Sequence, residues 1–209
     1  DVLTAAALEN AMVLHAAFGG STNLLIHTAA IAFHAGLKRP AAGDWARVNR
    51  QIPRLVDALP NGPENHPTVF VFLAGGVPEV MLHLRRAGLL NTRALTVSGL
   101  TLDEALNWWE QSERRARFRK LMLERDGVAP ERVIMDPDAA RRRGLTSTVC
   151  FPAGNLAPEG AVAKISGQEG ERFRGPARVF ESEEEALARI LDGTVKKGEV
   201  VVIRYEGPR

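Results

Sequence analysis

The sequence contains one cysteine, Cys150, among 209 residues. A single cysteine excludes an internal disulfide, and it excludes a thiolate zinc site or an iron–sulfur cluster built from this chain alone. Such sparse cysteine is typical of a reducing compartment, so we expect a cytoplasmic protein. Cys150 itself is predicted to pack as a small apolar side chain.

Long apolar runs and a charge excess are also missing. No stretch of 18 apolar residues occurs, and the N-terminus lacks the charged-then-apolar order of a signal peptide, so we expect no membrane association. The 27 basic residues nearly balance the 25 acidic ones, which argues against a nucleic-acid partner. The chain opens at Asp1 and stops just after a strand-like stretch, so we expect a segment of a longer protein.

The sequence divides into two parts that differ in predicted secondary structure. Its apolar content of 45% is enough for a hydrophobic core. Residues 1–140 are predicted to be mainly helical, and residues 141–209 to form a small sheet or partial barrel with one packed helix. The expected strands are 146–151, 162–165, 178–180 and 200–205. Between the last two, the capping box Ser182-Glu183-Glu184-Glu185 predicts a helix.

Two glycine pairs organise the helical part. The stretch 5–18 reads as a helix, Gly19-Gly20 as a turn, and the apolar residues after Asn23 as a second, buried helix that Ser21 or Thr22 caps. Gly75-Gly76 repeats this device. Residues 68–73, in front of it, are too few to distinguish a strand from a helical turn.

A capping box at Thr101–Glu104 predicts a helix that runs to about Arg125, with Leu102, Leu106, Trp109 and Leu121 buried. The basic run at 114–120 favours a solvated helix face, because Glu110, Glu113 and Glu124 lie within helical reach. His15 and His27 are interpreted as core or interface histidines, and the three tryptophans as core or interface anchors.

Some residues could contact a small anion. A helix N-terminus behind flexible glycines can bind a carboxylate through its free N–H groups. A tight junction between two helices, with no binding role, would show the same sequence pattern. Lys164 could reach an anion or be solvated, and His66 is the most plausible histidine for substrate contact. The candidate substrate-binding residues are Gly19, Gly20, Ser21, Thr22, Asn23, His66, Gly75, Gly76 and Lys164. No catalytic residue or metal ligand is predicted within the chain.

Motifs in one consistent order run along nearly the whole chain. They are Asn10-Ala11-Met12, Gly19-Gly20-Ser21-Thr22-Asn23, Ala74-Gly75-Gly76-Val77-Pro78, Gly154-Asn155-Leu156-Ala157-Pro158, Gly160-Ala161-Val162, Lys164, Val179-Phe180-Glu181-Ser182 and Arg204-Tyr205-Glu206-Gly207-Pro208. Together they resemble the dihydroxy-acid and aldonic-acid dehydratase family. Asn65-His66-Pro67-Thr68, Asn107-Trp108-Trp109-Glu110, Ser112–Arg115 and Arg143–Thr148 resemble its xylonate dehydratase-like branch.

The resemblance implies an α/β fold (α+β in detail) in which residues 1–140 end a larger α/β domain and residues 141–209 form most of a small β-barrel-like domain. It implies a hydro-lyase that removes water from a 2,3-dihydroxy carboxylate, a sugar acid such as D-xylonate, to give a 2-keto-3-deoxy acid. An iron–sulfur cluster and Mg²⁺ would take part. A homodimer or homotetramer is expected.

The chain departs from the family pattern because it has no cluster cysteines. We therefore predict that these 209 residues alone hold no cofactor and have no dehydratase activity. Glu206 is predicted to hydrogen-bond and orient a metal ligand that lies outside the chain, without touching the metal itself. The alternatives are a dihydroxy-acid dehydratase of branched-chain amino-acid synthesis, a small-anion-binding module and a dimerisation module.

Overall fold

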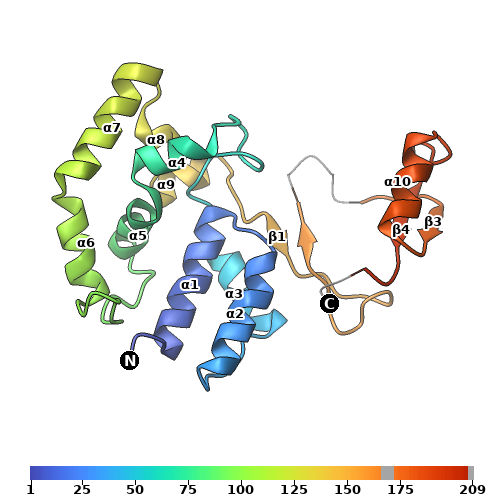
Figure 1. The fold of residues 1–209 in the computed structure, drawn as a ribbon, viewed down its shortest axis with the longest axis horizontal. Helices are drawn as coiled ribbons and strands as arrows, with labels where there is room; N and C mark the ends of the chain where they lie inside the picture. Colours follow the sequence, from blue (N-terminus) through green and yellow to red (C-terminus); the bar gives the residue numbers. More distant parts are fainter. Residues whose placement is uncertain (166–171, 207–209) are drawn as a thin grey trace. The chain divides into compact units, whose positions relative to one another are not determined.

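The computed structural model describes residues 1–165 and 172–206. The chain separates into two compact units, residues 1–166 and 167–209, which are described one at a time (Figure 1). The helices of the first unit are α1 (Ala5–Phe18), α2 (Asn23–His34), α3 (Ala42–Gln51), α4 (Thr68–Ala74), α5 (Gly76–Arg86), α6 (Leu102–Glu110), α7 (Glu113–Asp126), α8 (Pro130–Val133) and α9 (Pro137–Arg142).

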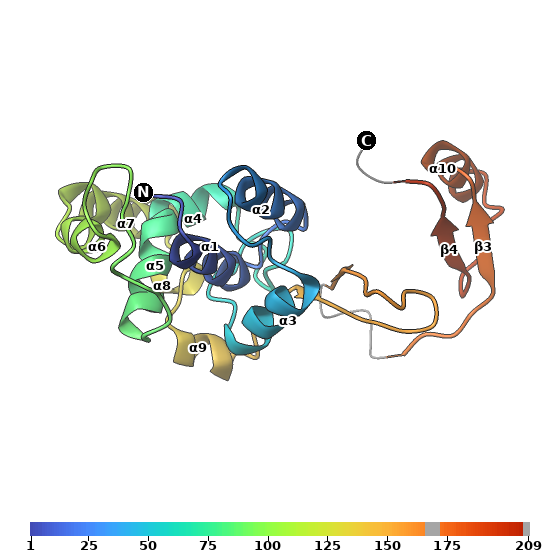
Figure 2. The same cartoon turned by 90° about the horizontal axis from the view of Figure 1, so that it is seen from below.

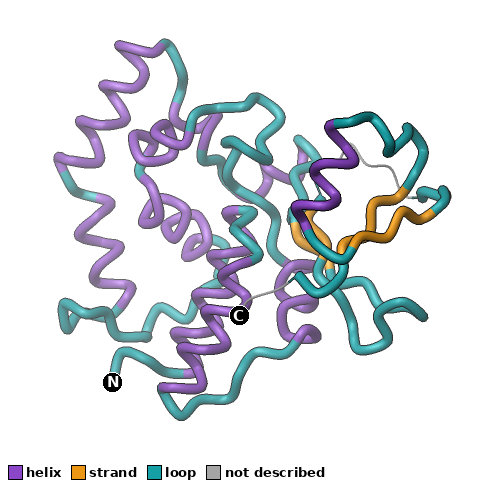
Figure 3. Tube along the Cα trace, turned by 45° about the vertical axis from the view of Figure 1, so that its right-hand side comes forward, coloured by secondary structure: helices purple, strands orange, loops and turns teal. Residues whose placement is uncertain are grey.

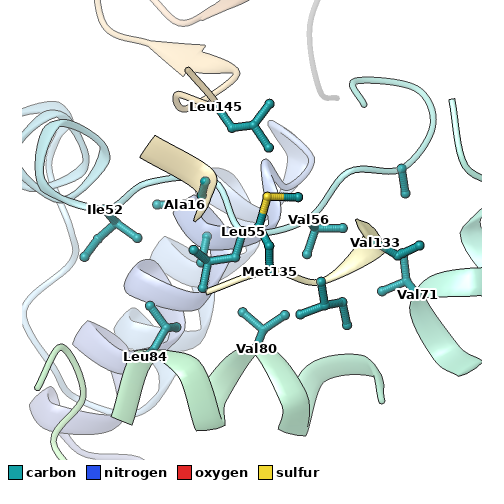
Figure 4. Close-up of a cluster of buried hydrophobic side chains, with 14 of the residues drawn as sticks. Ala16, Ile52, Leu55, Val56, Val71, Val80, Leu84, Val133, Met135 and Leu145 are labelled. Atoms are coloured by element: carbon teal, nitrogen blue, oxygen red, sulfur yellow. The ribbon is translucent and has the colours of Figure 1, made fainter. Parts of the chain in front are cut away.

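In the first unit, α1 packs against α2, α3 and α5, and α4 packs against α5, α7 and α8 (Figure 2). Two extended segments cross the core between these helices. The Leu55 N–H donates to Ala17 O at 2.7 Å, and the Met135 N–H donates to Leu55 O at 3.0 Å. Leu55 and Met135 lie among buried apolar side chains from α1, α4 and α5 (Figure 4). The C-terminal end of α1 is therefore anchored in the core.

The predicted helix over 101–125 is two helices. The Thr101 hydroxyl accepts the Glu104 N–H as expected, but α6 ends at Glu110 and α7 starts after Ser112. Leu102, Leu106 and Trp109 are buried as predicted, whereas Leu121 is 40% exposed and Met122 is buried in its place. The prediction for Leu121 is wrong because a break shifts the angular phase of every residue that follows it.

The stretch 68–73, which the sequence left open, is helical and forms most of α4. Among the described residues, no single helix has the length and hydropathy needed to cross a bilayer. The pair α4 and α5 meets that test only when joined, and it is bent by 61°.

All four predicted strands form (Figure 3). Three are shorter than expected, and the third begins one residue before the predicted 178–180. In the first unit β1 (Val149–Cys150) pairs antiparallel with β2 (Ala163–Lys164), with Val149 opposite Lys164. In the second unit β3 (Ala177–Phe180) pairs parallel with β4 (Val200–Ile203), and α10 (Glu183–Leu191) provides the connection that parallel strands require. The α/β class is confirmed. The described strands make two separate two-stranded sheets and do not close a barrel.

The second unit begins its helix as predicted, because the Ser182 hydroxyl accepts the Glu185 N–H at 3.2 Å. The division into 1–140 and 141–209 remains a prediction about the domains of a whole protein, since the compact units are defined by contacts within this chain.

Candidate functional site

The turn between α1 and α2 depends on its two glycines. Gly19 has a φ of +65°, and a Cβ there would lie 2.8 Å from the Arg54 Cδ. A Cβ on Gly20 would lie only 2.4 Å from the His15 Cδ2. The N–H groups of both glycines donate to the last carbonyls of α1, those of Ala16 and His15. Close packing therefore requires glycine at both positions.

His15 holds this turn from inside the core. Its Nε2 lies 2.9 Å from Ser21 O, and because a carbonyl only accepts, Nε2 carries the proton. The ring meets Trp45 edge-on at 5.2 Å, and only 5% of the residue is exposed. Burial lowers the pKa of His15, so the ring is neutral at pH 7. The interpretation of His15 as a core histidine is confirmed; His27 is exposed on α2.

Lys164 reaches the same turn from β2. Its Nζ donates to Gly20 O at 2.9 Å and lies 3.4 Å from Gly19 O. The Asn61 side-chain amide donates to Gly19 O at 3.3 Å, and Asn61 O accepts from Arg54 at 2.5 Å. Partial burial, and then the charge of Arg54, lower the pKa of Lys164. The structure thus brings three predicted site residues together, with lysine on the carbonyls that end a helix.

Ser21 and Asn23 lie on the outer side of the turn. The Ser21 hydroxyl accepts the Asn23 N–H at 3.3 Å, whereas Thr22, the residue before α2, makes no side-chain cap. Both Ser21 and Asn23 are exposed. The first residues of α2 therefore face solvent in the described chain.

The helix behind them is not buried as predicted. Only Thr28 and Ala32 of α2 are buried, while Ile26 and Phe33 are 53% and 62% exposed. The reason is that α2 packs mainly on α1, which covers a single stripe of it. The apolar residues on its remaining surface are open to solvent.

At Gly75-Gly76 the backbone packs closely against a second side chain, the buried carboxylate of Glu79. A Cβ on Gly75 would lie 2.7 Å from the Glu79 Cβ. Glu79 is 1% exposed and receives hydrogen bonds from Arg115 at 2.6 and 2.8 Å and from Arg119 at 3.3 Å. Burial alone would raise the pKa of Glu79, but the bond from Arg115 and the two guanidinium charges lower it overall. The prediction of a solvated basic face thus fails for Arg115 and Arg119.

His66 is turned inward. It is 8% exposed, and its Nε2 lies 3.2 Å from Glu64 Oε2 without hydrogen-bond geometry. Glu64 also pairs with Arg132 and, at 2.8 Å, with Arg143. In the described chain no hydrogen bond or ion pair joins His66 to the Gly19–Asn23 turn.

Three further predictions can be compared with the structure. Cys150 is predicted to pack as a small apolar side chain, but it is exposed: β1 turns its side chain outward while Val149 is buried. Trp45 and Trp109 are buried, whereas Trp108 is 67% exposed. Glu206 Oε1 accepts the Glu183 N–H at 3.0 Å and so supports the start of α10.

The described residues do not fit the metal groups that the sequence pattern implies. Within 1–165 and 172–206, no group of three or more His, Cys, Asp or Glu side chains could hold a metal ion. None of these described residues is therefore assigned a part in cluster or magnesium chemistry.

Two family models match most of the chain. The model for the N-terminal part of dihydroxy-acid/6-phosphogluconate dehydratases matches residues 1–105, and the model for the C-terminal part matches residues 137–209. The chain belongs to the dihydroxy-acid/6-phosphogluconate dehydratase family. Lys164 and the turn that it binds lie in regions of the chain that different family models match.

Relatives in Escherichia coli (strain K12) match all of this chain. It is 54% identical to D-xylonate dehydratase YagF and 51% identical to D-xylonate dehydratase YjhG, each over 216 residues. It is 40% identical over 209 residues to the dihydroxy-acid dehydratase of Methylococcus capsulatus (strain ATCC 33009 / NCIMB 11132 / Bath), again across the whole chain. The chain spans about a third of the length of these relatives, 33–34%.

Sequence reasoning missed Arg54, Asn61 and Glu79. Glu79 follows a glycine pair and a proline, a position that reads only as an acidic first turn of a helix. Arg54 bonds Asn61 seven residues away, a spacing that no helix or strand rule predicts here, and Asn61 bonds Gly19 across 42 positions. Nothing local distinguishes them from surface residues.

Proposed function

We propose that the protein containing this chain is a hydro-lyase that removes water from a sugar acid such as D-xylonate and releases a 2-keto-3-deoxy acid. The observation that supports this most is the 54% and 51% identity, across the whole chain, to two proteins named D-xylonate dehydratases. Identity to the dihydroxy-acid dehydratase of Methylococcus capsulatus is lower, at 40%. That difference favours a sugar acid over the branched substrate of amino-acid synthesis, which is the second candidate.

The part of the reaction that this chain serves is substrate positioning. The exposed Ser21 and Asn23 stand on a turn whose backbone is held by His15 and Lys164. A rigid polar turn of this kind suits contact with a carboxylate or hydroxyl group, because its donors need no rearrangement on binding. Substrate contact by Gly19–Asn23, Gly75-Gly76 and Lys164 remains part of the proposal.

Family membership supports an iron–sulfur cluster and Mg²⁺ in the whole protein, held by residues outside this chain. With its single cysteine exposed and no metal-binding group among the described residues, the chain by itself is proposed to be inactive. A homodimer or homotetramer in the cytoplasm completes the proposal.

The test is an anaerobic assay of keto-acid formation by the whole protein. The kcat/KM for D-xylonate is expected to be at least about ten-fold higher than that for 2,3-dihydroxyisovalerate. A site that hydrogen-bonds the extra hydroxyl groups of a sugar acid has polar groups that stay without partners when a substrate lacks those hydroxyls. A higher kcat/KM for 2,3-dihydroxyisovalerate would replace the sugar acid by the second candidate. No turnover of either acid by iron-loaded protein would contradict the hydro-lyase itself.

A further inference from the structure

A polar cleft lies between α3 and the segment 144–152, outside the glycine turns and the Glu79 ion pair. It consists of two hollows, of about 400 Å³ and 240 Å³, that share Asn49, Arg50, Thr146 and Ser147. The larger hollow alone lies in the size range of small-molecule sites. α3 packs directly against β1, so one side of the cleft is helix and the other is the chain that enters and leaves this strand.

The charge of the lining is of one sign. Arg50 and Arg141 line the cleft, and no aspartate or glutamate does. In the described chain Arg50 has no carboxylate within ion-pair distance, and Arg141 has only the exposed Asp138 on its own helix, at 3.1 Å. Exposed pairs of that kind are weak and yield readily to another anion. The cleft therefore favours a negatively charged ligand.

The floor of the cleft is rigid. Ser147 Oγ donates to Asn49 Oδ1, the Asn49 amide donates to Trp45 O at 2.9 Å, and the Val149 N–H donates to Ser147 Oγ at 3.2 Å. These bonds join α3 to the start of β1 before any ligand binds. Thr146, next to them, is exposed and lines both hollows, which places a hydroxyl group beside Arg50 in the lining.

We propose that this cleft binds a small oxyanion, with the Arg50 guanidinium as its main contact and the Thr146 hydroxyl as a second donor. Guanidinium groups bind phosphate and carboxylate alike through paired N–H donors, so the shared chemistry is that of an oxyanion. The apolar wall of Val149, Phe151 and Pro152 accommodates a short carbon chain attached to it. This inference goes beyond the proposed function and does not depend on it.

The experiment is a calorimetric titration of the whole protein with inorganic phosphate, D-xylonate and xylitol. Xylitol carries hydroxyl groups but no charge, so it separates the oxyanion from the carbon chain. Saturable binding of phosphate, with none of xylitol, is expected. D-xylonate is also the proposed substrate, so only the part of its binding that is lost in Arg50→Gln is assigned to this cleft. Binding of xylitol as tightly as D-xylonate, or no saturable binding of either anion, would overturn the proposal.

Variants locate the binding. Arg50→Gln is expected to weaken anion binding at least about ten-fold, in line with the loss of a charge-assisted hydrogen bond. Arg47→Gln is the matched control, because Arg47 lies on the same helix and pairs with Glu9 outside the cleft. Thr146→Val should weaken binding without unfolding the chain, and phosphate should slow amide exchange within 144–152. Equal affinities for the Arg50 and Arg47 variants, or unchanged exchange in that segment, would exclude this cleft as the site.

Discussion

The residue type at each position of the α1–α2 turn is restricted by the room that neighbouring side chains leave, as much as by backbone conformation. Gly20 has an ordinary φ, yet the His15 ring occupies the position where a side chain would begin. The same ring donates to Ser21 O, so it cannot move away without losing that bond. His15 and Gly20 therefore act as one packed pair.

Gly20→Ala is expected to destabilise the fold by about 1–3 kcal/mol, the usual range for overpacking in a rigid core. Gly43→Ala is the control, since nothing lies within 4 Å of a Cβ at that position in α3. It should leave stability unchanged or raise it by up to about 1 kcal/mol through helix propensity. Denaturant unfolding of the two variants checks this. Equal stabilities would mean that His15 has space to move.

At the scale of elements, a buried ion pair joins α5 to α7. The Glu79 carboxylate lies beneath the bend between α4 and α5, and Arg119 also donates to Ala74 O at 2.8 Å, at the end of α4. Three helices thus meet at one carboxylate. The basic run of α7, which the sequence predicts to be a solvated face, contributes two half-buried arginines to the buried Glu79 carboxylate.

Glu79→Gln is expected to cost about 3–5 kcal/mol, because it leaves two guanidinium groups without their buried partner. Glu124→Gln removes a carboxylate that faces Lys120 at 3.6 Å on the surface of α7, and should cost less than about 1 kcal/mol. Unfolding free energies measured at pH 7 compare the two. A small loss for Glu79→Gln would show that water replaces the carboxylate.

The same carboxylate gives a pH dependence with a definite sign. The pKa of Glu79 is lower in the folded chain than its ordinary value, so its contribution is present above the unfolded pKa of about 4.3 and is lost as pH falls toward the folded pKa. The loss of stability in acid should therefore be smaller in Glu79→Gln than in the unchanged protein.

At the scale of the whole molecule, Lys164 joins distant parts of the chain. It lies 144 residues from Gly20, and the regions around the two residues match different family models. Its ammonium group lies on the carbonyls of Gly19 and Gly20, just beyond the C-terminal end of α1, where the helix dipole is negative. β2 is thereby attached to the turn that carries Ser21 and Asn23.

Lys164→Met keeps the aliphatic part of the side chain and removes the ammonium group. We expect a loss of about 1 kcal/mol, the usual net worth of a hydrogen bond, with faster amide exchange in 19–25. Lys38→Met, an exposed lysine in the loop after α2, is the control and should leave exchange in the turn unchanged. If both variants exchange alike, Lys164 does not hold the turn.

The sequence determined those elements whose formation depends only on residues close together along the chain. The α1 helix, the glycine turns and the caps at Thr101 and Ser182 depend on residues within about four positions, so their pattern is complete in a short stretch. The ordered motifs along the chain likewise carried the family. Element lengths were less certain, because strands such as β1 depend on a partner for their ends.

Only the tertiary structure decided the partners. Lys164 reaches Gly20 across 144 positions, and Glu79 reaches Arg115 across 36, distances over which no spacing rule links two residues. The helical state of 68–74, the exposure of Cys150 and the lining of the cleft beside α3 likewise follow from packing. A residue type states which bonds a side chain can make, but the fold determines which group lies within reach.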